Sequence, residues 1–220
     1  MTSSLPYIFS TLKGTKHKEN WDELLIIEED KFSIFAVFDG VSSAKAGKEG
    51  PDISKHYIQE NYKKYLNGNF EVRKLMFDLN QHLVNLDLDE PYSTYCLVIF
   101  TKASNTFYYS WLGDSRIYYI TNQYIRQLTE DDSFSENIIS KYLGDATLRL
   151  SDFREFKEIK ESGHLLLCTD GFYKIFETNK LVFFETFINN SSANLNNLNK
   201  QIDSLIKGKN LDDSTFIFLK

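Results

Sequence analysis

Four short runs of β-favouring residues follow one another between Tyr95 and Thr129, and they constrain the fold more than any other feature. The runs are YCLVIFTK, TFYYSWLG, RIYYIT and QYIRQLT, and only short turns separate them. Apolar and aromatic runs joined in this way are typical of an antiparallel meander. The middle of the chain is therefore predicted to be sheet.

Further strands and helices are expected on both sides of this block. Strands are predicted at residues 7–14, 23–28, 31–39, about 152–160, 164–169 and 214–219. Helices are predicted at residues 53–66, 72–86, 179–188 and 195–206, where apolar residues recur at helical steps or the run is typical of a helix. Such stripes are typical of helices that face a core rather than of grooves for a partner.

The amount of apolar surface favours two packed sheets. The chain is 42% hydrophobic and 15% aromatic by residue count, so it has a large surface to bury. Two antiparallel sheets with helices outside are the economical way to bury it. The length of 220 residues, without a linker or repeat, suits one domain spanning residues 1–220. The predicted class is α+β.

Composition also bounds the compartment and the partners. The net charge of −6 argues against a nucleic-acid binder, which would carry a basic face. No apolar run is long enough to cross a membrane, and the start of the chain lacks the pattern of a secretory signal. Cys96 and Cys168 lie inside apolar strand patterns and are expected to be free thiols in a reducing cytosol. A cytoplasmic location follows as an expectation.

Aspartates stand at the ends of several predicted strands. Asp39 precedes Gly40 after one strand, Asp114 follows Gly113 after another, and Asp170 precedes Gly171 after a third. Asp22 comes just before the strand at 23–28, and Asp212-Asp213 comes just before the last strand. Any one of these alone is more simply interpreted as an ordinary turn, because Asp and Gly are turn formers. If the strands lie side by side, however, the carboxylates converge at one rim.

Carboxylates gathered at one rim need a cation. They would otherwise repel one another and raise one another's pKa. Apart from Arg116, no matching Lys or Arg accompanies the motifs. Oxygen ligands suit Mg²⁺ or Mn²⁺ rather than zinc or copper, and the Gly40 carbonyl is a further possible ligand. Two such ions can activate one water for in-line attack on phosphorus, without a nucleophile from the protein.

Six motifs in order make the chain resemble the metal-dependent protein phosphatases of the protein phosphatase 2C type. Asn20-Trp21-Asp22 is similar to the family's Asn-Glu-Asp element, and FAVFDG is similar to its Asp-Gly motif. WLGDSRIYYI and IRQLTEDDS resemble the Gly-Asp-Ser-Arg strand and the Leu-Thr-x-Asp-His-Ser element that follows it. LLLCTDGFYKIF and LDDSTFIFL resemble the (Ser/Thr)-Asp-Gly motif and the closing Asp-Asn-x-Thr strand. The matches run from about residue 13 to the C-terminus.

The resemblance implies a four-layer α-β-β-α sandwich that hydrolyses phosphoserine and phosphothreonine in proteins with Mg²⁺ or Mn²⁺. By position, Asp39 would bridge two ions and Gly40 would add its carbonyl. The resemblance implies that the coordination shells of the two ions are completed, largely through waters, by Asp22, Asp170 and Asp212. Asp114, with Asp170, matches the place of a third ion in bacterial relatives. Phosphorylated proteins are the expected partners, with a serine/threonine kinase as a further candidate.

The chain departs from the family pattern at three places. His17 stands where the family has its phosphate-gripping Arg, so phosphate binding is weaker or passes to a neighbouring lysine. Val41 stands where some relatives have a His proposed as general acid. The flap is reduced to residues 134–142 before Leu143-Gly144. An open rim with low intrinsic selectivity among phosphopeptides is therefore expected.

Two other readings compete with an active phosphatase. A pseudophosphatase would keep the fold as a binding module, and the loss of the Arg and His favours it slightly. The retention of every acidic position counts against it, because unpaired carboxylates at one rim are costly without a metal. A structural domain with coincidental turn aspartates would not explain six motifs in order.

Overall fold

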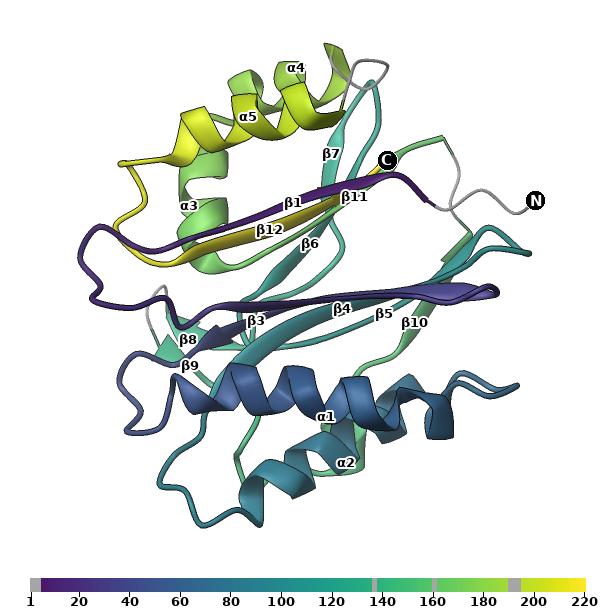
Figure 1. Cartoon of the computed structure of the whole chain (residues 1–220), viewed down its shortest axis with the longest axis vertical. Coiled ribbons are helices and arrows are strands. Elements are labelled where there is room, and N and C mark those ends of the chain that lie inside the picture. The colour runs from purple at the N-terminus through teal and green to yellow at the C-terminus, as the bar shows by residue number, and fades with distance from the viewer. Residues whose placement is uncertain (1–4, 136–137, 160–161, 190–194) are drawn as a thin grey trace.

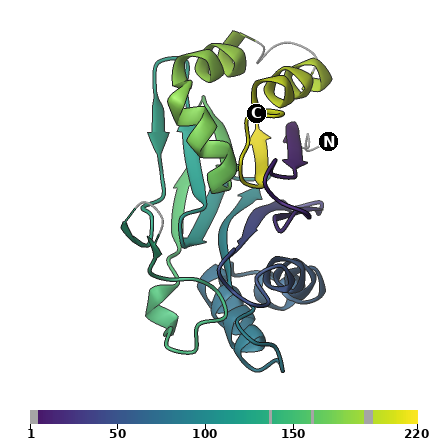
Figure 2. The same ribbon diagram turned by 90° about the vertical axis from the view of Figure 1, so that its left-hand side faces the viewer.

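Two five-stranded antiparallel sheets lie face to face, and helices cover both outer faces (Figure 1). The computed structural model describes residues 5–135, 138–159, 162–189 and 195–220. Within these ranges every paired strand is antiparallel. Figure 2, turned by 90°, shows the helices above and below the two sheets. The expected α+β sandwich of four layers is confirmed.

The first sheet contains the strands nearest both ends of the chain. Its order is β1 (Tyr7–Leu12), β12 (Ser214–Leu219), β11 (His164–Cys168), β6 (Arg116–Ile120) and β7 (Ile125–Gln127). The outer face of this sheet is covered by α3 (Asp170–Thr178), α4 (Lys180–Asn189) and α5 (Leu195–Ile206).

The second sheet holds the longest strands. Its order is β10 (Phe156–Ile159), β5 (Thr106–Leu112), β4 (Ser93–Thr101), β3 (Phe32–Gly40) and β2 (Glu23–Glu28). Its outer face is covered by α1 (Glu49–Tyr65) and α2 (Val72–Val84). A separate hairpin joins β8 (Ser133–Ser135) to β9 (Ile138–Ile139), and a short 3₁₀ turn covers Leu150–Asp152.

Strand alternation explains why the central strands are apolar on both faces. In β3, Ile34 and Phe38 face the core beneath α1 and α2, whereas Phe35 and Val37 face the other sheet. Side chains of a strand point alternately to its two sides, so a strand covered on both sides needs apolar residues at every position. The same alternation in β11 sends Leu166 outward to the α3–α5 helices. Three apolar layers result.

The observed elements correct the sequence expectations at several places. Residues 170–178 form the helix α3, which was not expected. The strand expected at 152–160 is confined to Phe156–Ile159 among the described residues, and the strand expected at 7–14 ends at Leu12. The other expected helices and strands are present within a few residues. Cys96 and Cys168 are buried free thiols, as expected.

The ring of Phe176 should be a large contributor to stability. It is fully buried and packs edge-on against Tyr118 and Phe183, with ring centroids 5.1 and 5.6 Å away. We expect Phe176→Ala to lower the free energy of unfolding by about 3–5 kcal/mol, because a buried cavity replaces the ring. Urea denaturation measures this change. The control Leu181→Ala, at a side chain 68% exposed on α4, should change it by less than about 0.5 kcal/mol. A Phe176→Ala loss no larger than that of the control would contradict the packing of α3.

Candidate metal centre

The predicted carboxylates meet at one end of the two sheets. A cavity of about 560 Å³ is lined by Asp39, Asp114, Asp170 and Asp212, together with Gly40. These residues come from the end of β3, the β5–β6 turn, the start of α3 and the loop before β12. Segments far apart in the sequence therefore contribute to one site, as the sequence predicted. Their role as metal ligands stays a prediction.

Asp22 lies behind this cavity as a buried carboxylate. Its Oδ2 accepts a hydrogen bond of 2.8 Å from the Thr169 hydroxyl, and its Oδ1 has no hydrogen-bond partner within the described ranges. Burial, with the charges of Asp213 and Asp170, raises its pKa well above the usual range, and the hydroxyls of Thr169 and Thr215 offset part of this shift. A buried charged oxygen without a donor is costly. A cation would satisfy it.

Asp39 is the carboxylate most surrounded by negative charge. Its pKa is raised well above the usual range, first by burial and then by four other carboxylates. Those four belong to Asp22, Asp170, Asp114 and Asp212. Asp39 therefore lies at the electrostatic centre of the group.

Asp114 and Asp212 border the cavity at two other points. Burial and the charges of Asp170 and Asp131 raise the pKa of Asp114 to about 6. The pKa of Asp212 is also raised, by burial and by Asp170, although its Oδ1 accepts a hydrogen bond of 2.9 Å from the Asp213 amide. Both carboxylates lack a full set of compensating donors and could serve as ligands.

Lys174 is a cation at this rim that the sequence did not predict. Its Nζ lies 2.6 Å from Asp170 Oδ2, one helical turn away on α3. The spacing of four residues places both side chains on the same helix face. The sequence signal was present in Asp170-x-x-x-Lys174. It was missed because the segment was read as a turn after a strand.

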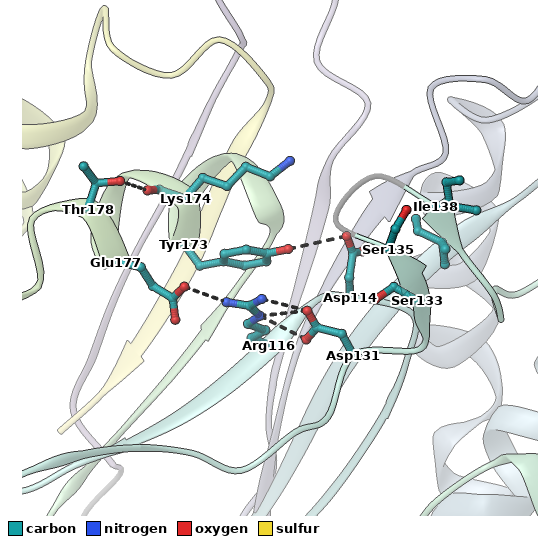
Figure 3. A pocket seen from close by; sticks show the side chains of 11 residues that line it. Asp114, Arg116, Asp131, Ser133, Ser135, Ile138, Tyr173, Lys174, Glu177 and Thr178 are labelled. Carbon is teal, nitrogen blue, oxygen red and sulfur yellow. Dashed lines mark hydrogen bonds and ion pairs between the residues drawn. The ribbon is translucent and has the colours of Figure 1, made fainter.

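Arg116, the cation expected near the motifs, is engaged elsewhere. Its guanidinium makes ion pairs with Asp131 at 2.7 Å and Glu177 at 3.0 Å, and it stacks on the Tyr173 ring at 3.6 Å (Figure 3). These groups line a second cavity of about 410 Å³ beside the β8–β9 hairpin. Both of its carboxylate partners lie outside the predicted ligand set. Arg116 therefore does not neutralise the metal rim.

His17 and Asp213 form a contact next to the rim. His17 Nδ1 lies 3.0 Å from Asp213 Oδ2, and Nε2 lies 3.4 Å from Asp212 Oδ1. Asp213 also accepts backbone hydrogen bonds from Gly14 at 2.6 Å and Trp21 at 2.8 Å. One ligand atom from each of His17, Asp212 and Asp213 falls within 4.8 Å of the others. Because Asp213 already has three partners, we assign it to holding the 14–22 segment.

Two glycines allow the backbone segments of the site to approach closely. A Cβ atom on Gly40 would collide with the carbonyl oxygen of Gly47, and one on Gly171 would collide with that of Asp213. Gly171 therefore lets α3 begin directly against the loop that carries Asp212. A side chain at either position would displace backbone that carries a predicted ligand.

The residues present fit one or two hard divalent cations. The fit rests on the orphaned buried Oδ1 of Asp22 and on the mutual repulsion felt by Asp39. The side-chain donors are oxygens, which Mg²⁺ and Mn²⁺ prefer. The free thiols Cys96 and Cys168 lie in the apolar layers of the fold and not at this rim.

Comparison with solved structures supports the fold. A bacterial serine phosphatase is 19% identical, with a TM-score of 0.82, covering 98% of this chain and 97% of that chain. The serine/threonine phosphatase Stp1 from Staphylococcus aureus is 18% identical, with a TM-score of 0.81, covering 99% and 95%. RsbX, determined in complex with magnesium, is 17% identical, with a TM-score of 0.67, covering 96% and 92%. At such identities the likeness establishes the fold alone.

The sequence comparison establishes the family. The model of the family described as Protein phosphatase 2C matches residues 14–207, and the chain belongs to this family. The resemblance inferred from the six motifs is confirmed. No curated protein matches the chain in sequence. No helix within the described ranges is long and apolar enough to cross a membrane.

The metal-free protein should become more stable as the pH falls from 7 to 5. The folded pKa of Asp114, about 6, is above the ordinary value of 3.8, so the folded state binds the proton more tightly. Protonation of Asp114 therefore raises the free energy of unfolding as the pH falls through 6, by about 1 kcal/mol at pH 5. The raised pKa values of Asp22 and Asp39 act in the same direction. Thermal denaturation in EDTA measures the trend.

The control for this trend is Asp114→Asn, which cannot be protonated in this range. It should be more stable than the parent at pH 7 in EDTA, and its pH dependence should be smaller. Mn²⁺ should stabilise the parent more at pH 7 than at pH 5, because protons compete for the same oxygens. A metal-free protein that loses stability between pH 7 and 5 would contradict the proximity of these carboxylates.

Proposed function

We propose that this chain is a Mg²⁺- or Mn²⁺-dependent protein serine/threonine phosphatase that hydrolyses phosphoserine and phosphothreonine. The observation that carries the proposal is the set of mutually repelling carboxylates around Asp39, with the orphaned Asp22 oxygen behind it. Membership in the protein phosphatase 2C family supports the same activity. We also infer that residues 1–220 act as one catalytic domain with a much shortened flap.

The proposed ligands are distributed over both sheets. Asp39 would contact two ions and Gly40 would offer its carbonyl oxygen. Asp22, Asp170 and Asp212 would complete the coordination shells of the two ions. Two such ions, when bound, supply Lewis acidity and an activated water for attack on phosphorus. The protein then needs to position the phosphate and assist the leaving group.

The leaving oxygen would take its proton from water in the cavity. Val41 lines the cavity at the place where a general acid would stand, and its side chain has no proton to give. Ser42 and Ser43 also line the cavity, but no histidine of the described residues does. We therefore propose water, in place of a histidine, as the proton donor.

Phosphate binding would use positive charge beside the metal rim. A cavity of about 460 Å³ is lined by four lysines, Lys16, Lys18, Lys45 and Lys48, and by His17. It adjoins the metal cavity, since Ser42 lines both. His17 is turned to Asp212 and Asp213. We therefore propose that the lysines share the phosphate binding predicted for His17. Electrostatic attraction from such a pocket would favour a dianionic phosphate.

A pseudophosphatase is the alternative. The replacement of the phosphate-gripping Arg by His17, and the ion pairs that engage His17 and two pocket lysines, favour it. The orphaned Asp22 oxygen counts against it, because a binding module has no need to bury an unpaired carboxylate. Hydrolysis of a phosphothreonine peptide with Mn²⁺, compared with EDTA, separates the two.

Asp39→Asn should abolish metal-dependent hydrolysis without unfolding the protein. The amide keeps the shape of the side chain but removes the charge that two ions would share. We expect kcat to fall by at least about a hundredfold, equivalent to about 2.7 kcal/mol. The same variant should be more stable than the parent in EDTA, because one of five repelling charges is gone.

The matched control for Asp39→Asn is Asp52→Asn. Asp52 is an exposed partner of His56 on α1, away from both proposed cavities, and its replacement should leave turnover within about twofold, since surface ion pairs contribute little. Undiminished Mn²⁺-dependent activity in Asp39→Asn would refute the assignment of the metal centre. Loss of activity in both variants would point to an unrelated cause.

Selectivity among phosphopeptides should be low. The predicted flap corresponds to the short β8–β9 hairpin, whose residues Phe134 and Ile138 are largely exposed, and residues 136–137 lie outside the described ranges. A short flap offers few contacts to residues that flank the phosphate, and discrimination needs such contacts in the transition state. Selection would then come from docking elsewhere, with a serine/threonine kinase as a candidate partner.

This prediction is tested by measuring kcat/KM over phosphopeptides whose residues on either side of the phosphate are varied. A spread above roughly a hundredfold would contradict the open site.

A further inference from the structure

The ammonium group of Lys174 lies among three of the predicted metal ligands. It pairs with Asp170 at 2.6 Å, and the charges of Asp170, Asp212 and Asp114 all act on it. Its side chain is 44% exposed, so the group is at the rim and not in the core. No other Lys or Arg within the described ranges lines the 560 Å³ metal cavity. Lys174 is therefore the cation that the protein itself contributes to that cavity.

Lys174 stands at the boundary between two cavities. It lines both the metal cavity and the neighbouring 410 Å³ cavity, and Asp114 also lines both. Asp114 and Asp170 are the two carboxylates at which the sequence resemblance places a third ion. Asp114 and Asp170 both line the metal cavity, and the charge of Asp170 contributes to the raised pKa of Asp114. The ammonium group lies in that part of the site.

The position of Lys174 is fixed by the helix that carries it. Phe172 and Phe176 anchor α3 with fully buried rings. The neighbouring Tyr173 ring is covered by the Arg116 guanidinium, and its hydroxyl lies 3.5 Å from Asp114 Oδ2. Figure 3 shows Lys174 and Tyr173 extending from α3 toward the same side, with the Tyr173 hydroxyl directed at Asp114. The lysine is thus held one turn from Asp170, and Asp114 lines the same two cavities.

Formal charge favours this arrangement over a third divalent ion. The five predicted ligand carboxylates and two divalent ions together leave one negative charge, which one ammonium group balances, and Glu90 adds a further negative charge to the cavity lining. A third divalent ion beside the ammonium group would leave a surplus of positive charge in a confined site. Like charges that close together are strongly unfavourable.

We propose that the Lys174 ammonium takes the place of a third divalent ion between Asp170 and Asp114, so that the chain works with two ions and one tethered cation. This inference rests on the proposed metal-dependent function. Lys174 is a positioning residue in this scheme. It orients the Asp170 carboxylate and supplies a fixed positive charge beside the two ions.

The experiment counts Mn²⁺ ions bound by the full chain at pH 7.5, by isothermal titration calorimetry checked against equilibrium dialysis. The parent should bind two ions at saturation. Lys174→Met keeps the aliphatic stem and removes the charge, and it should bind a third, weaker ion. Lys174→Arg keeps the charge and should bind two. Because the side chain is half-exposed, all variants should fold, which circular dichroism in EDTA verifies.

Asp114→Asn locates the extra ion. In the Lys174→Met background this change should return the count from three to two, and in the parent it should leave the count at two. Three ions in the parent, reduced to two by Asp114→Asn, would overturn the inference and leave the proposed phosphatase intact. A count that stays at two in Lys174→Met would overturn it as well. A single ion in the parent would overturn this inference alone, whereas no bound ion would overturn the metal-dependent function itself, and this inference with it.

Discussion

Repulsion among carboxylates at one rim is the constraint on which the rest of the structure depends. Asp39 is surrounded by four other acidic groups, and Asp22 is buried with one oxygen that lacks a donor. Burying charge in this way opposes folding. The energy to hold the rim together comes from three apolar layers, one between the sheets and one under each set of helices. The rim is therefore electrostatically unfavourable in the metal-free protein, and the proposed cations would reduce this repulsion.

The two sheets are joined at the rim by hydrogen bonds as well as by packing. The Thr169 hydroxyl, at the end of β11 in the first sheet, donates to Asp22, which precedes β2 in the second sheet. The same hydroxyl oxygen accepts the amide of Thr215 on β12 at 3.0 Å. One buried side chain thus ties the positions of three segments that are distant in the sequence. Sliding of one sheet over the other would break this link and separate the ligands.

Much of the fold could be predicted because strand alternation is a local property. Apolar residues on both faces of 31–39 and 164–168 identify strands covered on both sides, and the aspartates at strand ends indicated a shared rim. The helix α3 was missed because Asp170-Gly171 after a strand has the composition of a turn. The pattern of Phe172, Tyr173 and Phe176 carried the helical signal, but it spans too few residues to decide. Lys174 was missed with it, because only a helix brings that side chain back to Asp170.

His17, one of the three departures from the family pattern, is linked in space to Asp213. Asp213 stands at the Asn position of the closing Asp-Asn-x-Thr motif, and the two side chains are 3.0 Å apart. Asp213 also accepts the amides of Gly14 and Trp21, so it fixes the segment that leads to Asp22. An imidazole held against Asp213 and Asp212 supports this loop instead of reaching outward for a phosphate. The positive charge proposed to meet the phosphate would then come from the lysine-lined cavity next to Ser42.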